Sequence, residues 1–148
     1  MRSAVIIAIL LSLVACGNKD AGSAAPTLDH WHGQWVVINY WAQWCAPCIK
    51  EIPELNHLDQ DYAQVTVLGV NYDGTTGEEL ELQRQKLGVK FASLNTDPSE
   101  QLGIVRPVVL PTTLIIDPKG QLVATLVGPQ TLTSLAHATK QDLNKRPN

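Results

Sequence analysis

The feature that most constrains the fold of this chain is a pair of cysteines three residues apart, placed between a buried strand and a helix. Residues 34–41 are rich in β-branched and aromatic side chains and carry no charge, which predicts a strand covered on both faces. Pro47 favours a first helical turn, and from Cys48 onward apolar residues recur at three- or four-residue steps. Cys45 is therefore predicted at the junction of the strand and the helix.

The remaining segments predict alternating strands and helices. The helix that begins near Cys48 contains Pro53, which should bend it near residues 49–52. The further predicted elements are a strand at 65–72, a helix at 78–87 closed by Gly88, a helical turn at 99–102, strands at 112–116 and 121–127 joined by a turn at 117–120, and a helix at 131–143. This order predicts an α/β domain.

Composition narrows the class of protein. The chain has 148 residues, about one domain's worth, and 45% of them are hydrophobic. Its 11 Lys and Arg against 14 Asp and Glu give a net charge of −3, so we expect no nucleic-acid partner. Charged residues at 17% are too few for a disordered chain, and three cysteines are too few for a disulfide-stapled miniprotein.

The N-terminal residues predict an exported, anchored protein. Residues 1–15 have the layout of a signal peptide, and the apolar run is too short to span a bilayer. Residues 13–16, Leu-Val-Ala-Cys, resemble the lipobox of bacterial lipoproteins, which implies a lipid on Cys16; an ordinary secretory signal is the alternative. Residues 16–30 then form a flexible tether, and residues 31–148 form the domain.

If lipid occupies Cys16, the two cysteines left are Cys45 and Cys48. In an oxidising compartment, such a pair is more often redox-active or disulfide-bonded than metal-bound. A structural zinc site needs four ligands, and no second C-x-x-C exists to supply them. Four histidines are present, none in zinc-finger spacing: His30, His32, His57 and His137. We therefore expect neither a metal nor a cofactor.

The position of the two cysteines assigns their chemistry. A thiolate at a helix start is stabilised by unpaired N–H groups, which makes Cys45 the nucleophile. Cys48 lies one turn further on and can resolve the mixed disulfide that Cys45 forms. Ala46 and Pro47 supply no charge and no imidazole to stabilise the reduced thiolate, which favours a reductant over an oxidant. A static structural disulfide is the alternative.

Several motifs together resemble one known family. The segment 41–48 reads W-A-Q-W-C-A-P-C; it is followed by Pro53, by L-P-T-T at 110–113, by D-P-K-G at 117–120 and by Gly128, and the whole looks like a thioredoxin fold. With the membrane anchor, it resembles the TlpA-like branch, which includes the ResA-like and DsbE-like thiol-disulfide oxidoreductases. This resemblance implies an α/β thioredoxin fold, with a central mixed β-sheet flanked by helices on both faces.

The resemblance also implies which residues bind substrate. Leu110-Pro111 looks like the family's cis-proline turn, which lies against the C-x-x-C and pairs with a substrate strand. A proline on an edge strand is the alternative. Trp44 would offer an apolar contact beside the nucleophile, or else be ordinary core material. With Ala46 and Pro47, these residues form the predicted substrate site.

One departure from the thioredoxin pattern concerns proton transfer. Asn39 stands where cytoplasmic thioredoxin has a buried aspartate, and an amide does not exchange a proton at neutral pH. Glu51 takes the position of the ResA-like active-site glutamate, so we expect it to act as acid and base for Cys48. The alternative is a solvated glutamate in the first helical turn. Lys50, Glu54 and His57 are expected on the surface.

The sequence therefore predicts a membrane-tethered, periplasm-facing reductase of protein disulfides, with the choice of inner or outer membrane open. The resemblance implies a membrane electron donor of the DsbD or CcdA kind, and an apocytochrome c as one candidate substrate. A monomer is the default expectation. Two alternatives stay open: a disulfide oxidase or isomerase of the same fold, and a non-catalytic binding lipoprotein.

Overall fold

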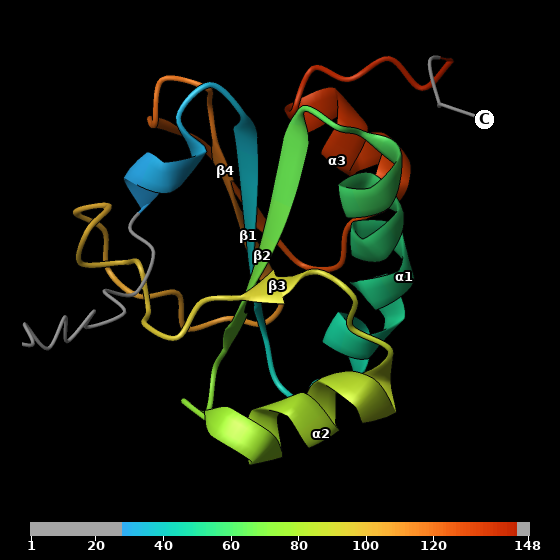
Figure 1. Cartoon of the computed structure of the whole chain (residues 1–148), viewed down its shortest axis with the longest axis vertical. Coiled ribbons are helices and arrows are strands. Elements are labelled where there is room, and N and C mark those ends of the chain that lie inside the picture. Colours follow the sequence, from blue (N-terminus) through green and yellow to red (C-terminus); the bar gives the residue numbers. More distant parts are fainter. Residues whose placement is uncertain (1–27, 145–148) are drawn as a thin grey trace, which may run out of the picture.

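The computed structural model describes residues 28–144, which form a mixed β-sheet with helices packed against it (Figure 1). The sheet order is β3-β2-β1-β4-β5, and β1 is parallel to β2 but antiparallel to β4. The strands are β1 (Trp35–Trp41), β2 (Val65–Asn71), β3 (Ala92–Ser93), β4 (Thr112–Ile116) and β5 (Leu122–Val127). The predicted thioredoxin-like α/β class with a central mixed sheet is confirmed.

The helices cover the sheet unevenly. The helical elements are η1 (Leu28–Trp31), α1 (Ala46–Asp61), α2 (Gly77–Leu87) and α3 (Leu132–Ala138). Helices α1 and α3 pack together on one side of the sheet, whereas α2 crosses beneath it near the end of β1 (Figure 1). The other face is covered mainly by η1 and by the irregular segment 94–110, whose apolar side chains pack against it.

Strand β1 is buried on both faces, as its composition predicts. Successive side chains of a strand point to opposite faces. Val37 accordingly belongs to the core beneath α1 and α3, whereas Ile38 and Tyr40 belong to the core on the other face. The same alternation directs Asn39 toward α1, where it meets Glu51.

The last helix is shorter than predicted. Its N-terminus forms a capping box between Thr131 and Ser134, but it ends at Ala138 and not near residue 143. Lys140 takes a left-handed conformation with φ 55°, and the backbone N–H of Gln141 donates to the Ala136 carbonyl. The left-handed Lys140 and this hydrogen bond end the helix. Apolar periodicity does not predict such an end.

Smaller differences concern short elements. Helix α2 ends at the left-handed Gly88 as predicted, and the strand bounds agree to within one residue. The predicted turn at 99–102 is a set of hydrogen-bonded turns, the first from the Leu102 N–H to the Pro98 carbonyl. Strand β3 and η1 were not predicted, because two- and four-residue elements carry too little periodicity.

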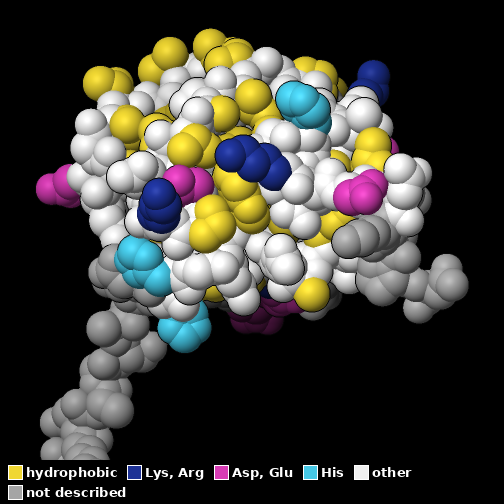
Figure 2. All heavy atoms as spheres, turned by 90° about the horizontal axis from the view of Figure 1, so that it is seen from above, with side chains coloured by type: hydrophobic (Ala, Val, Ile, Leu, Met, Phe, Trp, Pro, Cys, Tyr) yellow, Lys and Arg dark blue, Asp and Glu magenta, His cyan; other side chains and the backbone are white. Residues whose placement is uncertain are grey.

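The predicted signal peptide, Cys16 and most of the predicted tether lie outside the described residues. Within residues 28–144, none of the helices is long and apolar enough to cross a membrane. Figure 2 shows the end of the molecule at which α1 finishes; its few basic side chains stand apart, among uncharged, histidine and acidic ones. The described residues on that face form no continuous patch of one charge sign (Figure 2).

Candidate active site

The two cysteines lie where β1 gives way to α1, and they are joined as a disulfide. Cys45 occupies the N-cap position of α1, and its sulfur accepts a hydrogen bond from the Cys48 backbone N–H at 3.3 Å. Cys45 is 4% exposed and Cys48 is fully buried. The predicted junction is confirmed, and Cys45 is the slightly more exposed of the two cysteines.

An apolar cluster surrounds the disulfide. Trp41, Ala42 and Leu80 pack with the two cysteines, and the partly buried side chains of Tyr72, Leu87 and Leu110 pack against this cluster. At Cys45 this apolar cluster meets the N-terminus of α1, whose N–H groups favour a thiolate.

The chain just before β4 lies beside this cluster. The Leu110–Pro111 peptide bond is cis, and the Leu110 side chain contacts the disulfide cluster. The Pro111 carbonyl accepts a hydrogen bond from the Gly128 N–H at 2.9 Å, which ties the turn to the end of β5. Because β4 lies between β1 and β5, the alternative of an edge-strand proline is wrong.

The residues beside Cys45 are open to solvent. Trp44 is 63% exposed, so the alternative that its indole is core material is wrong. Its Nε1 donates to the carboxylate of Asp73, at 3.0 and 3.1 Å from the two oxygens. Ala46 and Pro47 are also exposed. Trp44, Ala46 and Pro47 therefore present an exposed surface next to Cys45.

Glu51 is buried at 1% exposure, so the alternative of a solvated first-turn glutamate is wrong. Its carboxylate accepts hydrogen bonds from Asn39 Nδ2 at 2.6 Å and from the Gln130 backbone N–H at 2.8 Å. Burial raises the pKa of Glu51 above its ordinary value, and these two hydrogen bonds oppose that shift only in part. A buried carboxyl group whose pKa is raised by burial therefore lies one turn after Cys48.

Asn39 links three segments of the chain at this point. Its Nδ2 also donates to Thr113 Oγ1 at 3.0 Å, so the amide bridges α1 and β4. Among the described residues, no hydrogen-bond partner lies near its Oδ1. Asn39 thus fixes the Glu51 carboxylate and cannot take its proton.

The three residues of α1 that were expected on the surface differ in exposure. Lys50 and His57 are exposed, as predicted. Glu54 is half-buried, and its carboxylate accepts a hydrogen bond from the Leu132 N–H at the start of α3. The prediction that Glu54 is merely a surface residue is wrong, because α3 returns to cover this part of α1. In residues 28–144, no three His, Cys, Asp or Glu side chains gather as a metal site would require.

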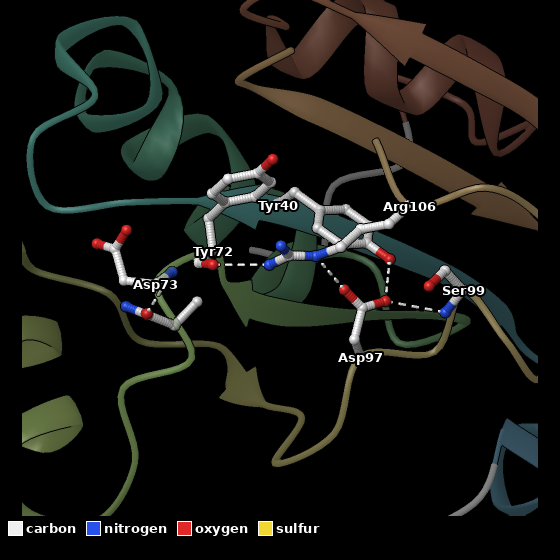
Figure 3. A network of polar contacts seen from close by, with 7 residues as sticks. Tyr40, Tyr72, Asp73, Asp97, Ser99 and Arg106 are labelled. Atoms are coloured by element: carbon white, nitrogen blue, oxygen red, sulfur yellow. Dashed lines mark hydrogen bonds and ion pairs between the residues drawn. The ribbon is translucent and has the colours of Figure 1, made fainter. Parts of the chain in front are cut away.

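A polar network that the sequence did not indicate lies beyond Leu110 (Figure 3). The Tyr40 hydroxyl and the Arg106 guanidinium both donate to Asp97, at 2.8 and 2.7 Å. Burial alone would raise the pKa of Asp97, but hydrogen bonds from Ser99, Tyr40 and Arg106 lower it below its ordinary value. Tyr40 lies 57 residues from Asp97 in the sequence, so local periodicity does not predict their hydrogen bond.

Comparison with known proteins shows the family of this chain. The model of the AhpC/TSA family matches residues 15–125. The chain belongs to the AhpC/TSA family. The match covers the C-x-x-C, Glu51 and the cis-proline turn, and the fold of this AhpC/TSA family chain is thioredoxin-like.

Two curated proteins illustrate the relationship. The thiol:disulfide interchange protein HelX of Rhodobacter capsulatus is 32% identical over 116 residues, which are 76% of this chain and 64% of HelX. The thiol-disulfide oxidoreductase ResA of Bacillus anthracis is 31% identical over 105 residues, 70% of this chain and 60% of ResA. The chain thus spans less than two thirds of the length of these relatives.

Solved structures share the fold. A secreted thiol-disulfide isomerase from Corynebacterium glutamicum superposes with a TM-score of 0.63 and 28% identity, over 76% of this chain and 72% of that chain. Similarity to a TlpA-like, ResA-like or DsbE-like protein, expected from the motifs, is therefore supported by relatives named for thiol-disulfide chemistry.

Proposed function

We propose that this AhpC/TSA family chain is a thiol-disulfide oxidoreductase that reduces disulfides of substrate proteins. The Cys45 thiolate attacks one sulfur of the substrate disulfide, and the other sulfur leaves as a thiolate that takes up a proton. Cys48 then attacks the Cys45 sulfur of the mixed disulfide and releases the second substrate thiol. Two electrons pass to the substrate, and the chain is left with the Cys45–Cys48 disulfide.

The observation that carries this proposal is the placement of the disulfide. It lies at the N-terminus of α1, with Cys45 slightly exposed, Cys48 fully buried and Leu110 packed against the cluster that contains both. A purely structural crosslink needs neither a cap position at a helix N-terminus nor an adjoining exposed surface. A nucleophilic thiolate benefits from both.

Glu51 completes the proposed cycle as acid and base. The thiol of Cys48 must lose its proton before it can resolve the mixed disulfide. Glu51 lies three residues further along the same helix, and burial raises the pKa of its carboxyl, which favours its role as a proton acceptor. We assign Trp44, Ala46, Pro47, Leu110 and Pro111 to the binding of the substrate polypeptide.

The reductive direction rests on the residues between the cysteines. Ala46 and Pro47 are exposed and carry neither charge nor imidazole, so they do not strongly stabilise the reduced thiolate. A dithiol without such stabilisation gives up its electrons readily, which corresponds to a low reduction potential.

The proposed setting is extracytoplasmic. The predicted signal peptide and lipidated Cys16 would hold the domain on a membrane, facing the periplasm or an equivalent compartment. The oxidised protein then needs an electron donor, for which a membrane transporter of the DsbD or CcdA kind is suited. An apocytochrome c, whose haem-binding thiols must stay reduced, is a fitting substrate.

A second candidate function is a disulfide isomerase or oxidase. It is favoured by the structural similarity to the secreted isomerase from Corynebacterium glutamicum, at 28% identity. The same residues would carry it, with the cycle starting from a different redox state in the cell.

The reduction potential of the full chain in detergent separates these functions. Equilibration with glutathione, followed by tryptophan fluorescence, should give a value at or below about −230 mV for a reductase. A value near about −120 mV would assign an oxidant. If no reversible two-electron transition occurs, the pair is a static crosslink and the chain is a binding protein.

A further inference from the structure

Arg106 joins Asp97 to Tyr72, the residue after β2 (Figure 3). Its Nε donates to Asp97 at 2.7 Å, and its Nη2 donates to the Tyr72 backbone carbonyl at 2.6 Å. The guanidinium also lies over the Tyr72 ring, 4.0 Å from the centroid. One side chain thus makes an ion pair, a hydrogen bond to backbone and a cation–π contact.

The middle of segment 104–110, which carries Arg106, is not fixed by burial, although the Val109 carbonyl accepts a hydrogen bond from Thr112 Oγ1 at 2.7 Å. Ile104 and Leu110, at its two ends, pack against the core. Between them, Val105 is 88% exposed and Val108 is 83% exposed, so neither is fixed by burial. The contacts of Arg106 therefore restrain a stretch that apolar packing leaves free.

Tyr72 and Asp73 connect segment 104–110 to the disulfide cluster and to Trp44. The Tyr72 side chain packs against the disulfide cluster, and its carbonyl and ring bind Arg106. The neighbouring Asp73 carboxylate binds the indole of Trp44. Two adjacent residues after β2 therefore set the spacing between Trp44 and the segment that leads to Leu110.

We propose that Arg106 is a positioning residue: by binding Asp97 and the Tyr72 carbonyl, it holds the Leu110–Pro111 backbone at the correct distance from Trp44 and Cys45 for an extended substrate polypeptide. This inference rests on the proposed oxidoreductase function. It assigns to Arg106 no contact with the reacting sulfur atoms. Loss of its contacts would impair polypeptide docking without changing the chemistry of the thiol.

Two disulfide probes of different size test this. The full chain in detergent, with Cys16→Ser and Cys48→Ser in every variant, keeps Cys45 as its one thiol. It reacts either with dithiobis(nitrobenzoate) or with a short unstructured peptide whose one cysteine carries thionitrobenzoate. In both reactions the Cys45 thiolate forms a new disulfide and coloured thionitrobenzoate leaves, so one absorbance reports both rates.

Arg106→Gln should lower the rate constant for the peptide probe about tenfold, because a displaced backbone no longer aligns the peptide. The rate constant for the small probe should stay within about twofold, because that probe makes few backbone contacts. Arg106→Lys should recover part of the peptide rate, since lysine keeps the charge toward Asp97 but not the forked geometry.

Arg84→Gln is the matched control. Arg84 also pairs with a carboxylate, that of Glu81, and donates to a backbone carbonyl, that of Phe91. The rate constants of Arg84→Gln for both probes should equal those of the parent. If circular dichroism shows that Arg106→Gln does not fold, Asp97→Asn weakens the same pair and should give a smaller change in the same direction.

Three results would overturn the inference. Unchanged peptide rates in Arg106→Gln would show that its contacts position nothing, and equal loss on both probes would place the effect on the thiol or the fold. If the parent's peptide rate, divided by that of free cysteine with the same probe, does not exceed the corresponding ratio for the small probe, the site recognises no backbone. A Cys45 no more reactive than free cysteine would instead refute the proposed function itself.

Discussion

Asn39 donates a hydrogen bond of 2.6 Å to the carboxylate of Glu51 and so joins the centre of β1 to the inner face of α1. Both side chains are buried, and the same carboxylate also accepts from the backbone N–H of Gln130. A titratable group is thereby fixed inside the core near the disulfide. Its charge state should influence both folding and thiol chemistry.

Replacing Glu51 by Gln should stabilise the oxidised protein at pH 7 by on the order of 1 kcal/mol. Burial raises the pKa of Glu51, so the stability it contributes is full below the unfolded value of about 4.5 and is lost as pH rises through the folded pKa. The variant should lack this loss. Urea unfolding at several pH values measures it, with the exposed Glu79→Gln as control.

The geometry accommodates that substitution. Glutamine can still accept from the Gln130 N–H and, once the Asn39 amide turns over, can donate to the Asn39 oxygen that has no partner among the described residues. If Glu51→Gln and the unchanged protein lose stability in parallel as pH rises, Glu51 is not the titrating group.

Asn39→Asp should destabilise the oxidised protein at pH 7.5 by about 2 kcal/mol, because two adjacent buried carboxyl groups cannot both ionise. The introduced group raises the pKa of the pair, so stability should be recovered as pH falls toward 5. Urea unfolding at the two pH values tests this. The exposed Asn95→Asp provides the control, and an equal loss at both pH values would point to packing rather than charge.

Cys48→Ser should trap the first step of the proposed cycle. Without the resolving thiol, the mixed disulfide between Cys45 and a substrate cannot be released, so it should accumulate severalfold in cells. Cys45→Ser should form none. Non-reducing electrophoresis with mass spectrometry identifies the trapped partners, and equal adducts in both variants would contradict the assigned roles.

Gly69→Ala should lower the free energy of unfolding by about 1 to 3 kcal/mol. A Cβ at this position of β2 would lie 2.8 Å from Trp41 Nε1 and 3.0 Å from the ring of Phe91, both fully buried. Glycine thus makes room for the indole that packs beside the disulfide. Urea unfolding followed by tryptophan fluorescence measures the loss, and an unchanged midpoint would mean that the indole shifts without cost.

Local patterns in the sequence determined most of the architecture. The strand before Cys45, the proline in the first helical turn and the glycine after α2 each act within a few residues, so their effects can be predicted from neighbours along the chain. The cis state of Leu110–Pro111 was expected from family resemblance rather than from such a pattern, and it is present.

Tertiary structure alone decided the environment of the polar residues. Glu51 is buried because the chain before α3, 79 residues away, returns to cover it, and Trp44 is exposed because its indole turns outward to Asp73. Arg106 meets Tyr72 across 34 residues. Burial and hydrogen bonding over such separations depend on how the elements pack, whereas periodicity specifies only which face of each element is apolar.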